Sequence, residues 1–169
     1  MVTMNSDALK NHITNPARPY LFELVIPDPG GGDSELWRMR GQSAVIPGRS
    51  FTKHHVDFKA TGGVEYAGKE RYGHRWETTL IESEDRETFN AFYTWMQEVL
   101  HNKTGIGAGD TVIKRDLYIT LINTDGTVGD KIKIIGCFPE EVPDTPLDMG
   151  SDDILRYTCA FSYDRWERG

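Results

Sequence analysis

The sequence predicts a mainly β fold, an antiparallel β-sandwich or partly closed barrel with one flanking α-helix. Hydrophobic residues alternate with a period of two along most of the chain, as in strands that bury one face. Only one segment, at about residues 83–101, changes to the helical period. The remaining pattern gives about six to eight strands that are mostly not separated by helical crossovers. That order favours an antiparallel arrangement over a doubly wound parallel sheet.

We expect the 169 residues to form a single domain, because no internal repeat or shift in composition divides the chain. Residues 1–18 are polar and are expected to form an extended N-terminal arm. They lack the apolar stretch of a signal peptide, and the longest apolar runs are far too short for a membrane span. We therefore expect a protein that is made in a cytosol and has no membrane span.

The first two strands are expected at residues 19–27 and 35–45. In the first strand, alternate residues form one apolar face: Tyr20, Phe22, Leu24 and Ile26. Residues 27–33 hold two prolines and three glycines, which excludes a helix or strand there. The second strand is expected to end at a turn at residues 46–48.

Residues 49–72 are expected to form a long hairpin with little core of its own. The segment alternates weakly and contains three glycines, Gly62, Gly63 and Gly68. Because a two-stranded hairpin alone is marginally stable in water, it needs a partner surface. The alternative is an ordinary strand pair inside the monomer's own sheet.

A better strand is expected at residues 73–82, and the helix follows it. In the helical segment, large apolar residues recur at helical spacing: Phe89, Phe92, Tyr93, Met96, Val99 and Leu100. We expect this stripe to pack on the sheet. Ser83 is the expected N-cap, and the acidic residues near it, Glu82 among them, are interpreted as solvated charge and capping. Gly105 can end the helix.

After the helix the period returns to two. A strand is expected at residues 117–122, followed by a turn at Asp125-Gly126. In the next strand, residues 131–138, Ile132 and Ile134 should lie opposite Cys137. Residues 139–146 hold three prolines and predict a loop. The last strand, residues 154–163, has the clearest apolar face: Leu155, Tyr157, Cys159, Phe161 and Tyr163.

The charge balance and the cysteines narrow the class of protein. The chain has 19 basic and 26 acidic residues and a net charge of −7. This balance disfavours an electrostatic grip on nucleic acid. Cys137 and Cys159 lie on apolar strand faces, so we expect two buried free thiols, with a bridge between their strands as the alternative.

The sequence contains no pattern typical of an active site. His54 and His55 are adjacent, so on a strand they point to opposite faces and do not converge on a metal. The glycines at residues 105–109 follow a helix and lack the lysine of a phosphate-binding loop. We therefore expect no catalytic residue, no metal site and no cofactor, and we predict a structural or assembly module.

Six short motifs, taken in their order along the chain, resemble the tail tube protein of T-even-like contractile-tailed bacteriophages. They are residues 18–24 (RPYLFEL), 44–49 (AVIPGR), 76–80 (WETTL), 92–96 (FYTWM), 136–142 (GCFPEEV) and 161–166 (FSYDRW). The resemblance covers about residues 18–166. It implies an antiparallel β-barrel with a flanking helix, a fold that also serves the type VI secretion tube protein.

The resemblance also implies an assembly. Six copies would form a ring, and rings would stack into a hollow tube inside a contractile sheath, through which DNA passes into the host. The implied partners are the tail sheath, baseplate, tail terminator and tape measure proteins. Genomic DNA would lie in the lumen without sequence-specific binding, which the acidic charge balance suits. The implied location is the virion tail, after assembly in the host cytoplasm.

Tube proteins of this family extend a long hairpin or loop to the neighbouring ring, which supplies a partner surface for the hairpin at residues 49–72. The residues expected to make this contact between subunits are Phe51, Lys53, Val56, Phe58, Lys59, Tyr66, Lys69 and Arg71. Two alternatives remain. One is a tube initiator or tail terminator with a tube-like fold, and the other is a small β-barrel domain that binds a ligand or has enzymatic activity.

Overall fold

The computed structural model describes residues 13, 16–27, 40–59, 62–101, 104–141, 145 and 147–169. Most of the expected N-terminal arm at residues 1–18 lies outside these ranges. So do residues 35–39 of the second expected strand and the loop at residues 28–33. Among the described residues, neither helix has the length and apolar composition that crossing a bilayer requires.

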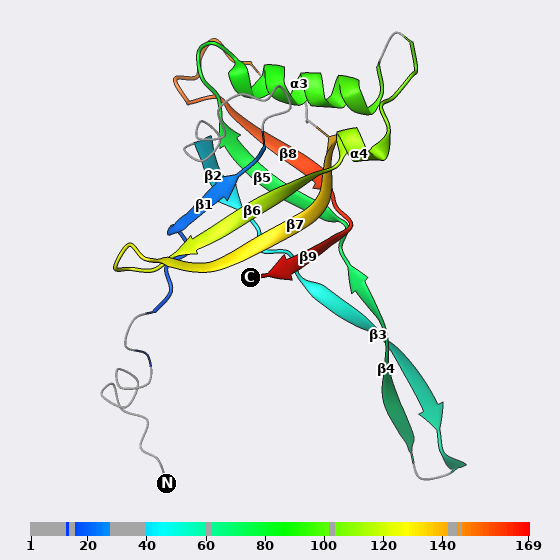
Figure 1. Ribbon diagram of the computed structural model, residues 1–169. Helices are drawn as coiled ribbons and strands as arrows, with labels where there is room; N and C mark the ends of the chain where they lie inside the picture. Colours follow the sequence, from blue (N-terminus) through cyan, green and yellow to red (C-terminus); the bar gives the residue numbers. More distant parts are fainter. Residues whose placement is uncertain are drawn as a thin grey trace.

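Seven strands form one antiparallel sheet, which confirms the predicted mainly β fold (Figure 1). Its order is β1-β6-β7-β8-β5-β2, and β9 pairs with β7. The bounds are β1 Phe22–Val25, β2 Gly41–Ala44, β5 Arg75–Ile81, β6 Arg115–Ile122, β7 Val128–Glu141, β8 Arg156–Ser162 and β9 Arg165–Arg168.

The sheet curls so that the two ends of its strand order come close together. A side-chain carbon added at Gly41 in β2 would lie 3.2 Å from the Cβ of Leu24 in β1. Along β7, β9 pairs with residues 132–135 and β8 pairs with residues 138–141. Because β7 changes partner partway along its length, the sheet bends there. The result is the partly closed barrel that the sequence predicts.

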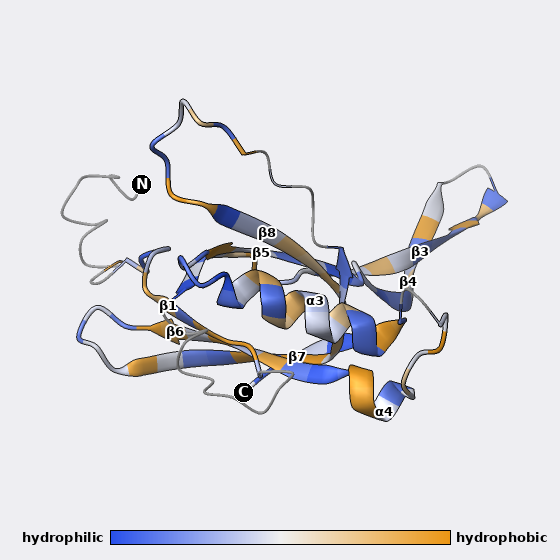
Figure 2. Cartoon of the chain, turned by 90° about the horizontal axis from the view of Figure 1, so that it is seen from above, coloured by the Kyte–Doolittle hydropathy of each residue, from blue (hydrophilic) through white to orange (hydrophobic). Residues whose placement is uncertain are grey.

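The core lies inside this curled sheet and is closed on one side by helix α3, Glu87–Val99. Figure 2 shows α3 lying across the fold, with β5 and β8 on one side and β6 and β7 on the other. The ring of Phe161 in β8 is central. Its centroid lies 5.5 Å from those of Trp76 and Phe92 and 5.8 Å from that of Trp95.

The helix presents a different face to the core from the expected one. Its buried residues are Thr88, Phe92 and Trp95, so the predicted burial of Phe92 is confirmed. Phe89, Tyr93 and Leu100, which were expected in the core, are exposed. The buried face is turned by one residue, about 100°, from the predicted stripe. Trp95 explains the difference. Its indole Nε1 donates to the carbonyl of Ile113 at 2.8 Å, and the Arg115 guanidinium lies 4.8 Å from its ring centroid.

The start of the helix also differs from the expectation. The N-cap is Arg86, not Ser83, and its side chain makes no capping hydrogen bond. Instead, the buried carboxylate of Glu82 accepts hydrogen bonds from the backbone N–H groups of Ser83, Thr88 and Phe89 at 2.9, 3.1 and 2.9 Å. Glu82 therefore caps the helix, which agrees with the capping role predicted for the acidic residues in this segment. Its carboxylate is buried, so the prediction of a solvated charge is wrong for Glu82.

A bulge in β7 corrects the expected position of Cys137. Leu117 pairs with Ile134 and Arg115 pairs with Cys137, so β7 contains one extra residue between these two pairs. Gly136 adopts a φ of 70° there, which favours glycine. The extra residue returns Cys137 to the buried face of Ile132 and Ile134, not to the opposite face.

Two other segments depart from the sequence prediction. The expected loop at residues 139–146 begins later, because β7 continues to Glu141 and Pro139 pairs with Phe161. β6 begins at Arg115, opposite Cys137, and does not extend past it, so β7 has only one paired edge at the proline. The short helix α4, Asp110–Ile113, and strand β9 were not expected from the sequence.

Cys137 and Cys159 are free and buried, as expected. Burial raises the pKa of each thiol from 9.0 to about 12. We expect both to react much more slowly with a disulfide reagent in the native protein than in denaturant. Equal rates in the two states would contradict this burial.

The same shift predicts a pH dependence. Above pH 9 the unfolded chain ionises its thiols while the folded chain keeps them neutral. The contribution of the buried neutral thiols to the free energy of unfolding is therefore complete below pH 9. It is lost as the pH rises towards 12. Urea unfolding midpoints across this range measure the loss, and replacing both cysteines with alanine should flatten this part of the profile.

Candidate assembly surface

Strands β3, Arg49–Asp57, and β4, Gly63–Tyr72, form a separate two-stranded sheet that projects from the body (Figure 1). Residues 49–72 thus form the hairpin expected from the sequence, outside the seven-stranded sheet. The alternative of a strand pair inside the main sheet is wrong. A hairpin that projects in this way exposes both of its faces.

One face of the hairpin is apolar towards its tip. Val56 pairs with Val64 on this face. The next pair on the same face, two residues nearer the body on each strand, is His54 with Tyr66. Val56, Val64 and Tyr66 each expose half or more of their surface, and Phe58 at the tip exposes 70%. Figure 2 shows hydrophobic stretches along an otherwise largely hydrophilic hairpin. Apolar residues grouped on an exposed element mark a surface for a partner.

The opposite face is charged, and its groups mostly pair with one another. His55 Nε2 lies 2.8 Å from a carboxylate oxygen of Asp57, and His55 Nδ1 lies 3.2 Å from one of Glu65. Nearer the body, the Arg49 guanidinium donates to Glu70 at 3.1 Å. These internal pairs make the charged face less dependent on a partner than the apolar face.

The structure places the eight expected contact residues in different parts of the hairpin. Val56 and Tyr66 lie on the apolar face, and Lys53 lies on the charged face. Phe58 and Lys59 lie at the tip, and the other three lie towards the body: Phe51, Lys69 and Arg71. Val64 was missed, although it stands two residues before Tyr66, the spacing of residues that share a strand face.

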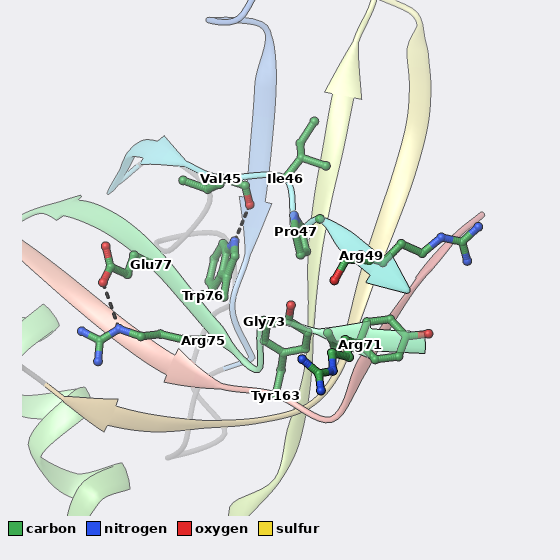
Figure 3. A pocket seen from close by; sticks show the side chains of 13 residues that line it. Val45, Ile46, Pro47, Arg49, Arg71, Gly73, Arg75, Trp76, Glu77 and Tyr163 are labelled. Carbon is green, nitrogen blue, oxygen red and sulfur yellow. Dashed lines mark hydrogen bonds and ion pairs between the residues drawn. The ribbon is translucent and has the colours of Figure 1, made fainter. Parts of the chain in front are cut away.

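A pocket of about 660 Å³ lies where the hairpin joins the body, and we call it the root pocket (Figure 3). One wall is the link from β2 to β3, where Val45 and Ile46 are more than half exposed. The Trp76 indole donates to the carbonyl of Val45 at 2.5 Å and holds this link in place. Tyr163, from the turn after β8, lines the pocket too, and burial raises the pKa of its hydroxyl.

Three arginines line the root pocket: Arg49, Arg71 and Arg75. Arg49 is paired with Glu70, and Arg75 donates to Glu77 and Glu141 at 3.0 and 3.1 Å. Arg71 forms no ion pair with any residue that the structure describes. It is therefore the pocket cation with its charge available to a partner.

These features define a class of protein. The described residues contain no cluster of metal-binding side chains. They do contain a barrel-like body, a projecting hairpin and a pocket at the base of that hairpin. An apolar patch on a projecting element is typical of a surface that contacts another protein chain.

Comparison with known families identifies the class more closely. The model of the family "Phage tail tube protein" matches residues 17–168, and the chain belongs to this family. No curated protein matches the sequence.

Solved structures share the fold. The sheath/tube terminator of PVC, an extracellular contractile injection system, has a TM-score of 0.68 at 16% identity, over 93% of this chain and 99% of that one. The PVC sheath-tube complex gives 0.64 at 16% identity, over 99% of both chains. The tube-terminating cap of the anti-feeding prophage gives 0.65 at 19% identity, over 91% of both. At these identities the likeness establishes the fold alone.

Proposed function

We propose that this protein is the repeating subunit of a phage tail tube. Six copies form a ring, and rings stack into a hollow tube within a contractile sheath. The family match across residues 17–168 carries this proposal. The exposed apolar face of the hairpin supports it, because it offers a contact surface between identical subunits. The role is structural and involves no catalysis.

The proposed partners follow from this role. The tube is surrounded by the sheath protein and joins baseplate and terminator proteins at its ends. Tape measure protein and then genomic DNA occupy the lumen on the way into the host. The subunits assemble in the host cytoplasm and remain in the virion tail. Neighbours solved as a sheath-tube complex and as part of a baseplate support these contacts.

A tail terminator is the second candidate, because two of the structures that share the fold are described as terminators. Copy number separates the two roles. A tube subunit is present in many copies along each tail, whereas a terminator forms a cap at one end. Quantitative mass spectrometry of purified tails, relative to the sheath protein, measures this ratio.

Electron microscopy of the purified protein tests the main proposal. We expect hollow rods or stacked rings of uniform diameter. A protein that stays monomeric at all concentrations and is absent from purified tails would contradict it. A few copies per tail would favour the terminator.

Assembled tubes are expected to bind short duplex DNA weakly or not at all. Nonspecific binding to DNA is driven by lysine and arginine side chains that displace the counterions of the phosphates. A subunit with a net charge of −7 instead repels the phosphates overall. Fluorescence anisotropy at several salt concentrations measures this, with unassembled subunits as the control for the outer surface. Tight binding with a steep salt dependence would contradict the expectation.

A further inference from the structure

The root pocket is out of reach of the hairpin of the same chain. β3 has nine residues, and a strand rises about 3.3 Å per residue, so the hairpin tip lies roughly 27 Å from its base. Figure 1 shows the hairpin extending away from the body. Whatever enters the pocket comes from elsewhere, and a second copy of the chain carries one such tip.

The hairpin tip and the root pocket have complementary chemistry. The tip presents the apolar side chains of Val56 and Val64 on one face, with Phe58 beside them. Its opposite face presents two carboxylates, Asp57 and Glu65, each of which also contacts His55. The Asp57 side chain is 87% exposed and that of Glu65 is 57% exposed.

The pocket presents matching groups. Its outer wall is apolar and is formed by Val45, Ile46 and Pro47. Arg71 supplies a guanidinium with no ion pair among the described residues. A tip with one apolar face and one acidic face thus corresponds to a pocket with an apolar wall and a cation.

We propose that the root pocket receives the hairpin tip of a second copy of this chain, with Arg71 pairing with a tip carboxylate. The inference rests on the proposed function and names the docking site for the hairpin. Every copy then carries a tip at one end of the hairpin and a pocket at the other. Such a contact joins two different surfaces, so it leaves one of each unfilled and propagates from copy to copy.

The first test is crosslinking between two separately made variants, Ile46→Cys and Phe58→Cys. Cys137 and Cys159 are buried and do not compete for the reagent. Mixed, assembled and treated with a short bismaleimide, the two variants are expected to give a covalent dimer. Val128→Cys, in place of Ile46→Cys, is the matched control, because Val128 is exposed and lies outside the pocket. An equal dimer yield with this control would overturn the proposal.

The second test reverses charge. Arg71→Glu is expected to raise the protein concentration needed for assembly by at least about tenfold, a typical cost for losing a charged contact. Asp57→Arg in the same chain should restore assembly at least in part. Circular dichroism checks that each variant is folded.

The outcomes separate the two proposals. If wild-type tubes form but the crosslink is absent and Arg71→Glu assembles normally, the docking site is wrong and the tube function stands. If the wild type forms no tubes, the tube function itself fails. If deleting residues 1–12 blocks assembly while Arg71→Glu does not, the occupant is the N-terminal segment, and the proposal is wrong.

Discussion

Replacing residues 52–69 with a short Gly-Ser linker is expected to leave the subunit folded and to abolish its assembly. The strands removed pair only with each other, and none of the buried core residues lies in this range. The variant keeps Tyr72, which packs partly against the core, and the links that form the root pocket. It loses the exposed apolar face of Val56, Val64 and Tyr66.

Two measurements test this expectation. Circular dichroism should show a cooperative thermal transition close to that of the wild type. Sedimentation velocity and electron microscopy should show only unassembled subunits. Val128→Ser is the control, because it removes an apolar side chain that is 71% exposed on the body. A linker variant that unfolds would place the hairpin in the core, and one that still forms tubes would remove its role in assembly.

The strand pattern could be predicted where alternation is regular on both sides of a ladder. Trp76, Thr78 and Leu80 are buried in β5. Facing them in β8 are Phe161, Cys159 and Tyr157, in the same order. Each strand shows a clean period of two, so its buried face follows from the sequence alone.

The errors arose where a tertiary contact decided between two local patterns. Helix α3 has apolar residues over a wide arc, and the hydrogen bond of Trp95 to Ile113 selects one edge of it. The face of Cys137 depends on the bulge at Gly136, which adds a residue to one strand only. Periodicity within one segment contains no information about either contact.

The candidate site was predictable in part for the same reason. The hairpin is a local structure, and its weak alternation and glycines indicated it. The root pocket combines Val45, Arg71 and Tyr163, which are far apart in the sequence. Only the folded chain brings them together.

Phe92→Ala is expected to lower the free energy of unfolding by about 3–5 kcal/mol. Phe92 is 2% exposed, and its ring meets that of Phe161 edge to face at 5.5 Å. The substitution would leave a cavity between α3 and the sheet, in a core that also holds Trp95. Truncating a buried aromatic side chain loses both its transfer free energy and its packing contacts.

Phe89→Ala is the matched control, because it makes the same chemical change on the same helix, three residues earlier. Phe89 is 40% exposed and contacts Tyr93 and Tyr157 at ring distances of 6.1 and 5.9 Å. We expect it to cost about 1–2 kcal/mol, because only part of its surface is removed from water. Urea unfolding in the linker variant, which is expected to stay monomeric, measures both costs without interference from assembly. Similar losses for the two variants would favour the helix face predicted from the sequence, and a loss below about 1 kcal/mol for Phe92→Ala would place that side chain on the surface.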